Sequence, residues 1–192
     1  MSEVLKVLKD ATADLHSATE QYAYTAEIST GKLTPDLYHD LLLKNYYARQ
    51  VIEQSLYQSK HFLDASFRVV YQSKLDALKR DLSRFPSATT TFEPIFNFEI
   101  THLAHVTGVL YVTEGSMLGG QVIKKLLLKN EQLVAFQPFH FYTWLGKATR
   151  VYWKQFTEFA TNHIQTQAVE TLAVEAAIES FSFFHAVYQK KA

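Results

Sequence analysis

Apolar residues recur every three or four positions along most of this chain, which is the period at which one face of an α-helix repeats. The spacing is clear near the start, in Leu5, Leu8, Thr12, Leu15, Thr19 and Tyr22. It predicts a first helix over about residues 4–23. Gly31 follows this helix and marks a break, because glycine commonly punctuates helical patterns.

The same period predicts five further helices. Thr34, Pro35 and Asp36 give the second helix an N-cap, a proline at the first helical position and an acid in the first turn. This helix is expected to run to Tyr57. The others are expected over about 71–84, 98–129, 142–162 and 166–188, with a loop at 87–94 and an interruption at Gln137-Pro138. The pattern therefore predicts an all-α, multi-helical bundle in a single domain, residues 1–192.

The composition is typical of a folded domain and excludes several classes of function. The chain has 192 residues, of which 47 % are hydrophobic and 20 % charged, as expected for a domain with a sizeable core. Its 19 Lys and Arg balance its 19 Asp and Glu, so no net charge attracts nucleic acid or an anionic membrane. The absence of cysteine excludes disulfides, thiolate metal sites and cysteine nucleophiles.

Two further features bear on where the protein acts. The first ten residues, MSEVLKVLKD, lack the apolar core of a signal peptide. The sequence also lacks the long apolar run, about 18 residues or more, that a membrane-spanning helix needs. We therefore expect a cytoplasmic protein with no membrane partner.

Candidate chemistry appears first in the helix over 4–23. Lys9, His16 and Glu20 are seven and four residues apart, so they lie near one face of that helix. A neutral imidazole at His16 could bind a metal ion, and Glu20, one turn further on, could orient the ring or raise its basicity. The same spacing also fits an exposed polar pair that stabilises the helix slightly. Spacing alone leaves both interpretations open.

The helix over 98–129 contains the run EGSMLGGQ, residues 114–121, with three glycines. An interior glycine costs a helix about 1 kcal/mol relative to alanine, so the run costs roughly 3 kcal/mol. Gly108, Gly115 and Gly119 are seven and four residues apart and share one face. A face without side chains permits close packing of another helix, approach of a planar ligand, or a kink. The glycine spacing does not decide between packing and a ligand.

Together the segments LKDATADLHSATE (8–20) and YVTEGSMLGGQVIKK (111–125) resemble the two helices that enclose haem in the haem oxygenase family. The first segment follows the family pattern LK-x-x-T-x-x-x-H-x-x-x-E, and the second resembles its glycine-rich distal helix, which ends in GGQV. The resemblance is closest to bacterial, biliverdin-producing members. It implies haem between the first helix and a kinked, glycine-rich distal helix.

The resemblance implies roles for several charged residues. His16 matches the iron ligand on the proximal side of the haem, and Glu20 matches the acid one turn beyond it. Lys9 matches a cation that pairs with a haem propionate. Lys154 matches a second propionate-binding cation near the C-terminus, and Arg150, one turn earlier, could take its place.

The distal helix both follows and departs from the family pattern. Gly115 and Gly119 match the glycines whose backbone lies against the haem and the bound oxygen. Ser116 stands where mammalian-type members carry an aspartate that organises a distal water network, so a neutral hydroxyl is expected to hold the waters there. Glu158 stands where a propionate-binding arginine is expected. Because an acid repels a propionate, we expect the haem to be positioned differently in this protein.

The activity that the resemblance implies is cleavage of haem to biliverdin, CO and Fe²⁺, which requires O₂ and electrons. Haem is then both cofactor and substrate. The expected electron donor is a ferredoxin or a flavodoxin-type reductase. A bacteriophytochrome is one acceptor of biliverdin that the resemblance suggests.

Two other classes of function remain open. Ser116 and Glu158 leave room for a haem-binding or sensing protein that has the same fold but no turnover. The pairs Asp36/His39 and Glu99/His102 have the i, i+3 spacing of di-iron sites in helical bundles. A non-haem di-iron oxidase on the same scaffold is therefore a further alternative.

Overall fold

The computed structural model describes residues 2–59, 71–86, 98–144 and 146–190. The long helices are α1 (Glu3–Tyr22), α3 (Pro35–Gln58), α6 (Leu103–Leu127), α8 (Thr149–His163) and α9 (Gln167–Gln189). Shorter elements are α2 (Thr25–Ser29), α5 (Leu75–Leu82), α7 (His140–Thr143) and the 3-10 turns η2 (Glu131–Phe136) and η3 (Gly146–Ala148). No strand occurs within these ranges, and the expected all-α fold is confirmed.

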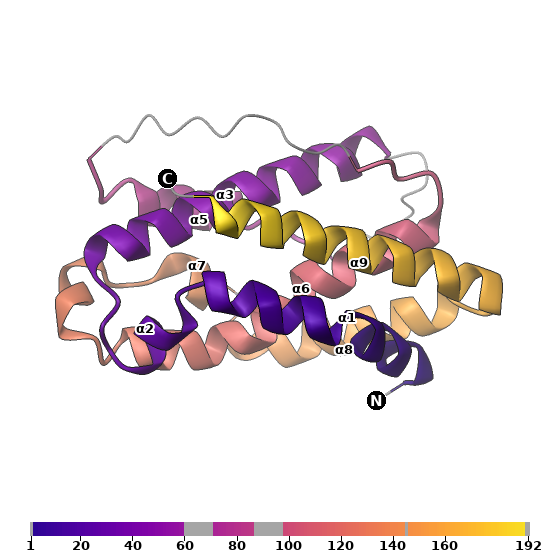
Figure 1. Ribbon diagram of the computed structural model, residues 1–192, viewed down its shortest axis with the longest axis horizontal. Coiled ribbons are helices and arrows are strands. Elements are labelled where there is room, and N and C mark those ends of the chain that lie inside the picture. The colour runs from indigo at the N-terminus through magenta and orange to yellow at the C-terminus, as the bar shows by residue number, and fades with distance from the viewer. Residues whose placement is uncertain (1, 60–70, 87–97, 145, 191–192) are drawn as a thin grey trace.

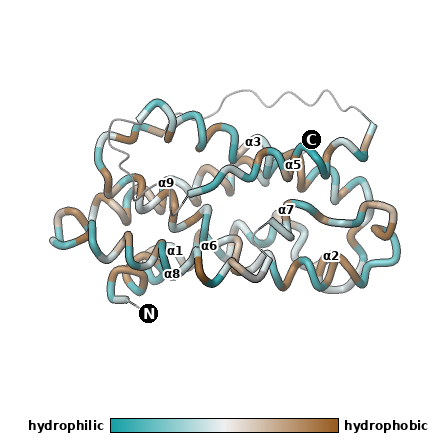
Figure 2. Tube along the Cα trace, turned by 180° about the vertical axis from the view of Figure 1, so that it is seen from behind, coloured by the Kyte–Doolittle hydropathy of each residue, from teal (hydrophilic) through white to brown (hydrophobic). Residues whose placement is uncertain are grey.

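Helix α9 packs with α6 at the centre of the fold, and each of the other long helices lies against one or both of this pair (Figure 1). It packs along α6 and along α1, and α3 lies against it as well. Helix α8 packs on α6. Hydrophobic and hydrophilic residues alternate in short bands along the helices, as expected where each helix turns one face inward (Figure 2). Because α1 and α6 are both held by α9, the space between these two helices has fixed walls.

Two apolar clusters form the core. One joins α1, α6, α8 and α9 through residues such as Leu8, Leu110, Phe156 and Phe183. The other joins α3 with α5, α6 and α7 and contains Tyr38. Within the described ranges, no helix combines the length and the apolar character that crossing a bilayer requires.

Capping side chains set several helix starts where the sequence predicts them. Thr34 Oγ1 accepts a hydrogen bond from the Leu37 N–H at 3.3 Å and caps α3. Thr166 caps α9 in the same way. Gly31 adopts a positive φ of 69°, which accounts for the break before α3.

Other boundaries differ from the prediction for identifiable reasons. The helix expected from Tyr71 begins at Leu75, because residues 71–74 are not helical and Lys74 is buried in the core. The helix expected from Phe98 begins at Leu103. The segment expected as one helix over 142–162 divides into α7 and α8, with Gly146 at a positive φ of 49° between them. Helix α2 was not predicted, and the expected loop at 87–94 lies outside the described residues.

Asp81 of α5 holds the start of α7. Its two carboxylate oxygens accept hydrogen bonds from the N–H groups of His140 and Phe141, at 2.8 and 2.9 Å. We expect Asp81→Ala to lower the free energy of unfolding by about 2 kcal/mol, because two N–H groups lose a buried charged acceptor. Urea denaturation measures the loss. Asp76→Ala, on the exposed side of α5, is the matched control and should change stability by less than about 0.5 kcal/mol; equal losses would contradict the capping role.

Candidate functional site

A cavity of about 600 Å³ lies between α1 and α6, and residues of α2, α3, α7, α8 and α9 also line it. This volume lies within the range of small-molecule binding sites. Most of the lining is apolar, with contributions such as Leu5, Met117, Phe181 and Phe184. Leu118 and Val122 of α6 also line the cavity, and they are 37 % and 60 % exposed. The cavity therefore presents apolar side chains to solvent at its opening, where an apolar ligand would cover them.

The α1 wall carries the residues that sequence spacing brings to one face. Lys9, His16 and Glu20 all line the cavity. His16 Nδ1 lies 3.7 Å from Glu20 Oε2, and the two side chains are 54 % and 56 % exposed. The imidazole also meets the Phe181 ring edge-on, at a centroid distance of 5.5 Å. With Nδ1 facing Glu20, Nε2 is the nitrogen available to a ligand.

The α6 wall is formed by the glycine run. Gly115, Ser116, Gly119 and Gly120 all line the cavity, and α6 is helical without interruption across them. A Cβ built on Gly119 would have nothing within 4 Å, so this position opens onto free space. A Cβ on Gly115 would lie 3.6 Å from the Trp153 ring, which is ordinary contact.

Gly108 serves a different purpose from the glycines further along α6. A Cβ there would lie 2.2 Å from the carbonyl oxygen of Ala173 and 2.7 Å from the backbone nitrogen of Ala177, both on α9. Gly108 therefore permits close packing of α6 on α9, whereas Gly115 and Gly119 keep the cavity wall bare. The packing interpretation is therefore confirmed for Gly108, and the ligand interpretation stays a prediction for Gly115 and Gly119.

Arg49 of α3 is a cavity residue that the sequence analysis missed. Its side chain is buried, and its Nη2 donates a hydrogen bond to Ser116 Oγ at 3.0 Å. The guanidinium lies over the Phe141 ring, 5.0 Å from its centroid. Ser116 Oγ in turn donates to the Thr113 carbonyl at 2.8 Å. The Ser116 hydroxyl proton is thus directed to backbone, and the charged donor beside it is Arg49.

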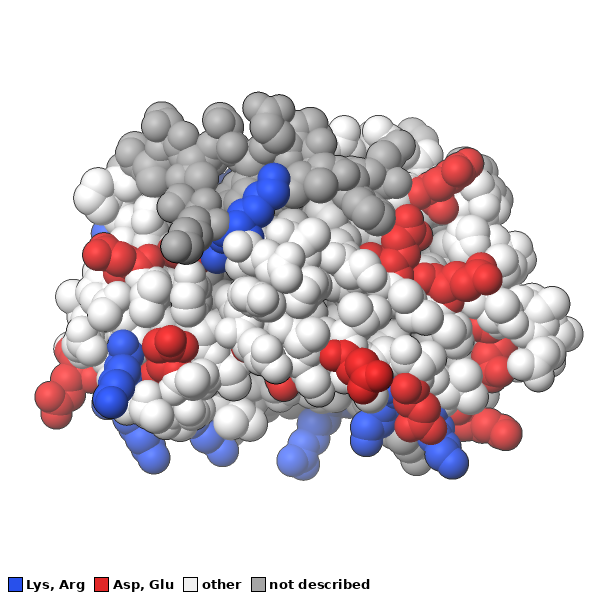
Figure 3. All heavy atoms as spheres, viewed as in Figure 1, with Lys and Arg blue, Asp and Glu red and all other residues white. Residues whose placement is uncertain are grey.

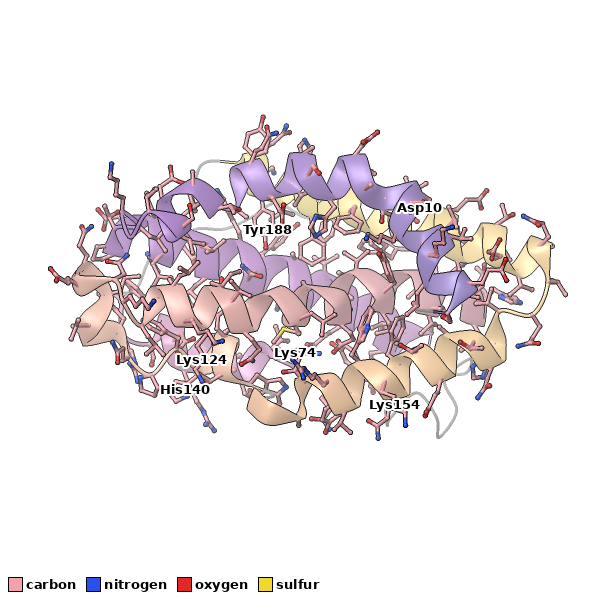
Figure 4. The ribbon with its side chains drawn as sticks, turned by 90° about the horizontal axis from the view of Figure 1, so that it is seen from below. Asp10, Lys74, Lys124, His140, Lys154 and Tyr188 are labelled. Atoms are coloured by element: carbon pink, nitrogen blue, oxygen red, sulfur yellow. The ribbon has the colours of Figure 1, made fainter. Side chains whose placement is uncertain are left out.

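Asn45 and Tyr188 extend this polar part of the wall. Tyr188 Oη donates to Asn45 Oδ1 at 3.1 Å, and Asn45 Nδ2 donates to the Leu41 carbonyl at 2.8 Å. Burial raises the pKa of Tyr188 to about 12, although the charge of Arg49 opposes the shift. The phenol is therefore neutral at physiological pH. Tyr188 lies in the space between α1 and α6 (Figure 4).

A buried ion pair lies directly behind the glycine run. Lys74 Nζ donates to Glu114 Oε1, and the two side chains are 1 % and 6 % exposed. The Lys74 ammonium also lies over the Tyr71 ring, 5.0 Å from its centroid. Burial lowers the pKa of Lys74, and the charge of Glu114 opposes that shift. The pair ties residues 71–74 to the part of α6 that forms the cavity wall.

Lys154 and Arg150 do not join the other predicted site residues. Both side chains are exposed on α8, and neither lines the cavity. Lys154 Nζ lies 3.6 Å from Glu158 Oε1, and its side chain lies on the outer side of α8 (Figure 4). The face in Figure 3 carries charges of both signs around a large uncharged area. Propionate binding by Lys154 or Arg150 stays a prediction.

The residues of the di-iron alternative have other contacts. The His39 ring stacks on Phe85 at a centroid distance of 4.5 Å. His102 Nδ1 accepts a hydrogen bond from the Ala104 N–H at 3.0 Å and caps α6. Over the described ranges, the structure brings together no group of three or more His, Asp or Glu side chains that could hold a metal ion.

The fold and the cavity define an all-helical protein with a ligand-sized apolar chamber, an imidazole on one wall and helix backbone on the other. Residues 2–190 match the protein-family model described as Heme oxygenase, and the chain belongs to the haem oxygenase family. It is 33 % identical over 78 residues to a haem oxygenase of Xanthomonas campestris pv. campestris (strain 8004). That match covers 41 % of this chain and 46 % of the relative, less than half of its length.

The fold has a solved counterpart. The structure of haem oxygenase from Leptospira interrogans superposes with a TM-score of 0.74, over 97 % of this chain and 98 % of that one. The two sequences are 17 % identical. The similarity supports the fold, and the chemistry of the site depends on the residues of this chain.

Proposed function

We propose that this protein is a haem oxygenase, an oxidoreductase that uses O₂ and electrons to cleave haem to biliverdin, CO and Fe²⁺. The observation that carries the proposal is the pairing of two walls in one cavity. His16 lies on the α1 wall, and the bare backbone at Gly115 and Gly119 forms the α6 wall. Family membership over residues 2–190 supports the same activity.

The lining fits haem as the substrate. A flat, largely apolar macrocycle needs apolar walls, and the cavity supplies them from all five long helices. Leu118 and Val122 leave apolar surface exposed at the opening, which the ring of a bound haem would cover. Lys9 on the same wall as His16 supplies a cation for a haem carboxylate.

On the α1 wall, we assign iron binding to His16. Haem supplies the redox chemistry when it is bound; the protein supplies position and exclusion of water. Glu20 Oε2 lies 3.7 Å from Nδ1 of His16, so its charge favours the tautomer with a proton on Nδ1 and leaves Nε2 for the iron. A neutral imidazole suits oxygenation of the ring, since a thiolate ligand would favour O–O cleavage.

On the α6 wall, Gly115 and Gly119 let backbone approach the ligand where a side chain would collide with it. Ser116 lies between them, and its hydroxyl proton is engaged by the Thr113 carbonyl. We therefore assign Ser116 a positioning role: it accepts a hydrogen bond from Arg49 and holds that guanidinium at the cavity. Lys154 and Arg150 remain candidates for a propionate at the edge of the site.

The remaining parts of the proposal follow from family membership. Electrons come from a ferredoxin or a flavodoxin-type reductase, and a bacteriophytochrome is a candidate acceptor of biliverdin. The proposed location is the cytoplasm. A haem-binding protein without turnover is the second candidate, and it is favoured by the engaged proton of Ser116.

His16→Ala tests the iron ligand. We expect the variant bound to ferric haem to show a shifted Soret band, because the imidazole donor is lost. Added imidazole should restore the wild-type spectrum, since it can enter the space that the side chain leaves. An unshifted Soret band in His16→Ala would remove His16 as the ligand.

Gly119→Leu tests the bare wall. A Cβ at this position points into open space, so the larger side chain is expected to fold normally and to occupy the cavity. We expect haem affinity and biliverdin formation to fall at least tenfold. Gly119→Ala, which adds a single methyl group, is the matched control and should lose less. Unchanged conversion of haem to biliverdin by Gly119→Leu would contradict the assignment of this wall.

A further inference from the structure

We propose that Arg49 makes the Ser116 wall of the cavity a binding site for a small anion, held between the guanidinium and the iron of a bound haem. Azide is a suitable probe, and hydroxide has the same charge. The inference rests on the proposed function, because it needs haem in the cavity. It goes further by assigning a role to a residue of α3 that contacts Ser116 on the α6 wall, whereas His16 lies on the α1 wall.

The charge of Arg49 has no carboxylate partner within ion-pair distance among the described residues. Two acids lie near it in the fold, and both have other partners. Glu114 is paired with Lys74, and Glu53, one turn along α3, accepts a hydrogen bond from Tyr71. Arg49 is itself 4 % exposed. Because its guanidinium is shielded from water, an anion that enters the cavity and accepts one of its N–H groups gains a charge-assisted hydrogen bond, which is stronger than the bond a neutral acceptor would make.

The Arg49 guanidinium also has N–H groups that are not used in its present hydrogen bonds. Within the described ranges, its hydrogen-bond contacts, with Ser116 Oγ at 3.0 Å and with Met117 S at 3.9 Å, are both made by Nη2. Its buried Nε–H has no hydrogen-bond partner in the same part of the chain. Because a guanidinium has five N–H donors in a planar fork, Arg49 can hold its present contacts and still donate to a ligand.

The surroundings of Arg49 fix its position. Ser116 directs its own proton to the Thr113 carbonyl, so its oxygen is left to accept from Arg49. The Phe141 ring supports the guanidinium at 5.0 Å, a cation–π contact. A donor that is already oriented adds binding energy without a further cost in conformational entropy.

The other charged residues of the lining do not oppose an anion at this wall. Among the described residues that line the cavity, Glu20 is the one carboxylate, and it faces His16 on the α1 wall. Lys9 is a second cation, also on α1. Near Arg49 the polar groups of the wall are the neutral phenols of Tyr142 and Tyr188 and the Asn45 amide.

The test compares an anionic with a neutral ligand of ferric haem. Azide and imidazole are titrated into the ferric haem complexes of wild type and Arg49→Leu at fixed ionic strength, and the Soret band is followed. We expect the Kd of azide to rise at least about tenfold in Arg49→Leu, the loss of one charge-assisted hydrogen bond. The Kd of imidazole should stay within about twofold. Arg80→Leu removes an exposed arginine of α5 and should change neither Kd.

Three results would overturn the inference. They are an azide Kd in Arg49→Leu within twofold of wild type, equal weakening of azide and imidazole, and a loss of haem affinity with azide affinity retained. The last result would make Arg49 a haem carboxylate anchor.

If circular dichroism shows that Arg49→Leu is unfolded, Arg49→Gln is judged by the same criteria. A wild-type protein that forms no Soret band contradicts the proposed function, whereas a haem-cleaving protein with unchanged azide affinity contradicts this inference alone.

Discussion

Replacing Lys74 by leucine is expected to lower the free energy of unfolding by about 3–5 kcal/mol. The ammonium lies 1 % exposed and is paired with Glu114, which is 6 % exposed. Without Lys74 the buried carboxylate of Glu114 would lose its ion-pair partner. Glu114 directly precedes Gly115 on α6, so the loss should also loosen the cavity wall. Urea denaturation followed by circular dichroism measures the effect.

Two controls separate the buried charge from other causes. The double variant Lys74→Leu/Glu114→Leu should recover most of the stability, because an apolar pair of similar volume can replace a buried ion pair. Lys154→Leu breaks an ion pair whose side chains are 78 % and 60 % exposed and should cost less than about 1 kcal/mol. A double variant less stable than Lys74→Leu would contradict this account of the pair.

The second large effect is expected at Gly108. We expect Gly108→Ala to lower the free energy of unfolding by about 3 kcal/mol, the upper part of the usual range for an overpacked core. The added methyl group would lie 2.2 Å from the Ala173 carbonyl oxygen and 2.8 Å from the Ala176 Cβ. The first of these contacts is with backbone, so α9 would have to move. Because α9 carries Phe181, Phe184 and Tyr188 of the cavity, haem affinity should fall as well.

Gly119→Ala is the control for Gly108→Ala on the same helix. Its methyl group meets nothing within 4 Å, so the change should raise stability by up to about 1 kcal/mol through better helix propensity. Thermal and urea unfolding of the two variants give the comparison. Similar stability changes in the two would show that Gly108 does not govern the packing of α6 on α9.

Much of the fold could be predicted from the sequence because its signals are local. The three-to-four spacing of apolar residues marks the helices. Thr34 marks the start of α3 because its own side chain caps the helix, and Gly31 marks the preceding break through its own positive φ. The start of α5 could not be predicted in this way. It depends on Lys74 reaching Glu114, 40 residues further along the chain, and tertiary contacts of this kind override local propensity.

The cavity residues likewise fall into those that local sequence patterns predict and those that they do not. Lys9, His16 and Glu20 share one helix, so their spacing predicted one wall. Arg49 contacts Ser116 across 67 residues, and no local pattern links them. A signal was present: Asn45 and Arg49 are polar residues that continue the spacing of buried Leu42 and Ile52. A charged residue on an apolar stripe has to be compensated inside the fold, and that was the clue to a site.

The central claim, cleavage of haem to biliverdin, is tested most directly by absorbance. Haemin is added to the protein, then a ferredoxin with its reductase in the presence of oxygen, with catalase present to remove free peroxide. We predict a Soret band that forms with haem, decays on reduction, and is replaced by the red absorption of biliverdin as CO is released. A Soret band that persists through reduction and oxygenation would contradict the account and leave a haem-binding protein without turnover.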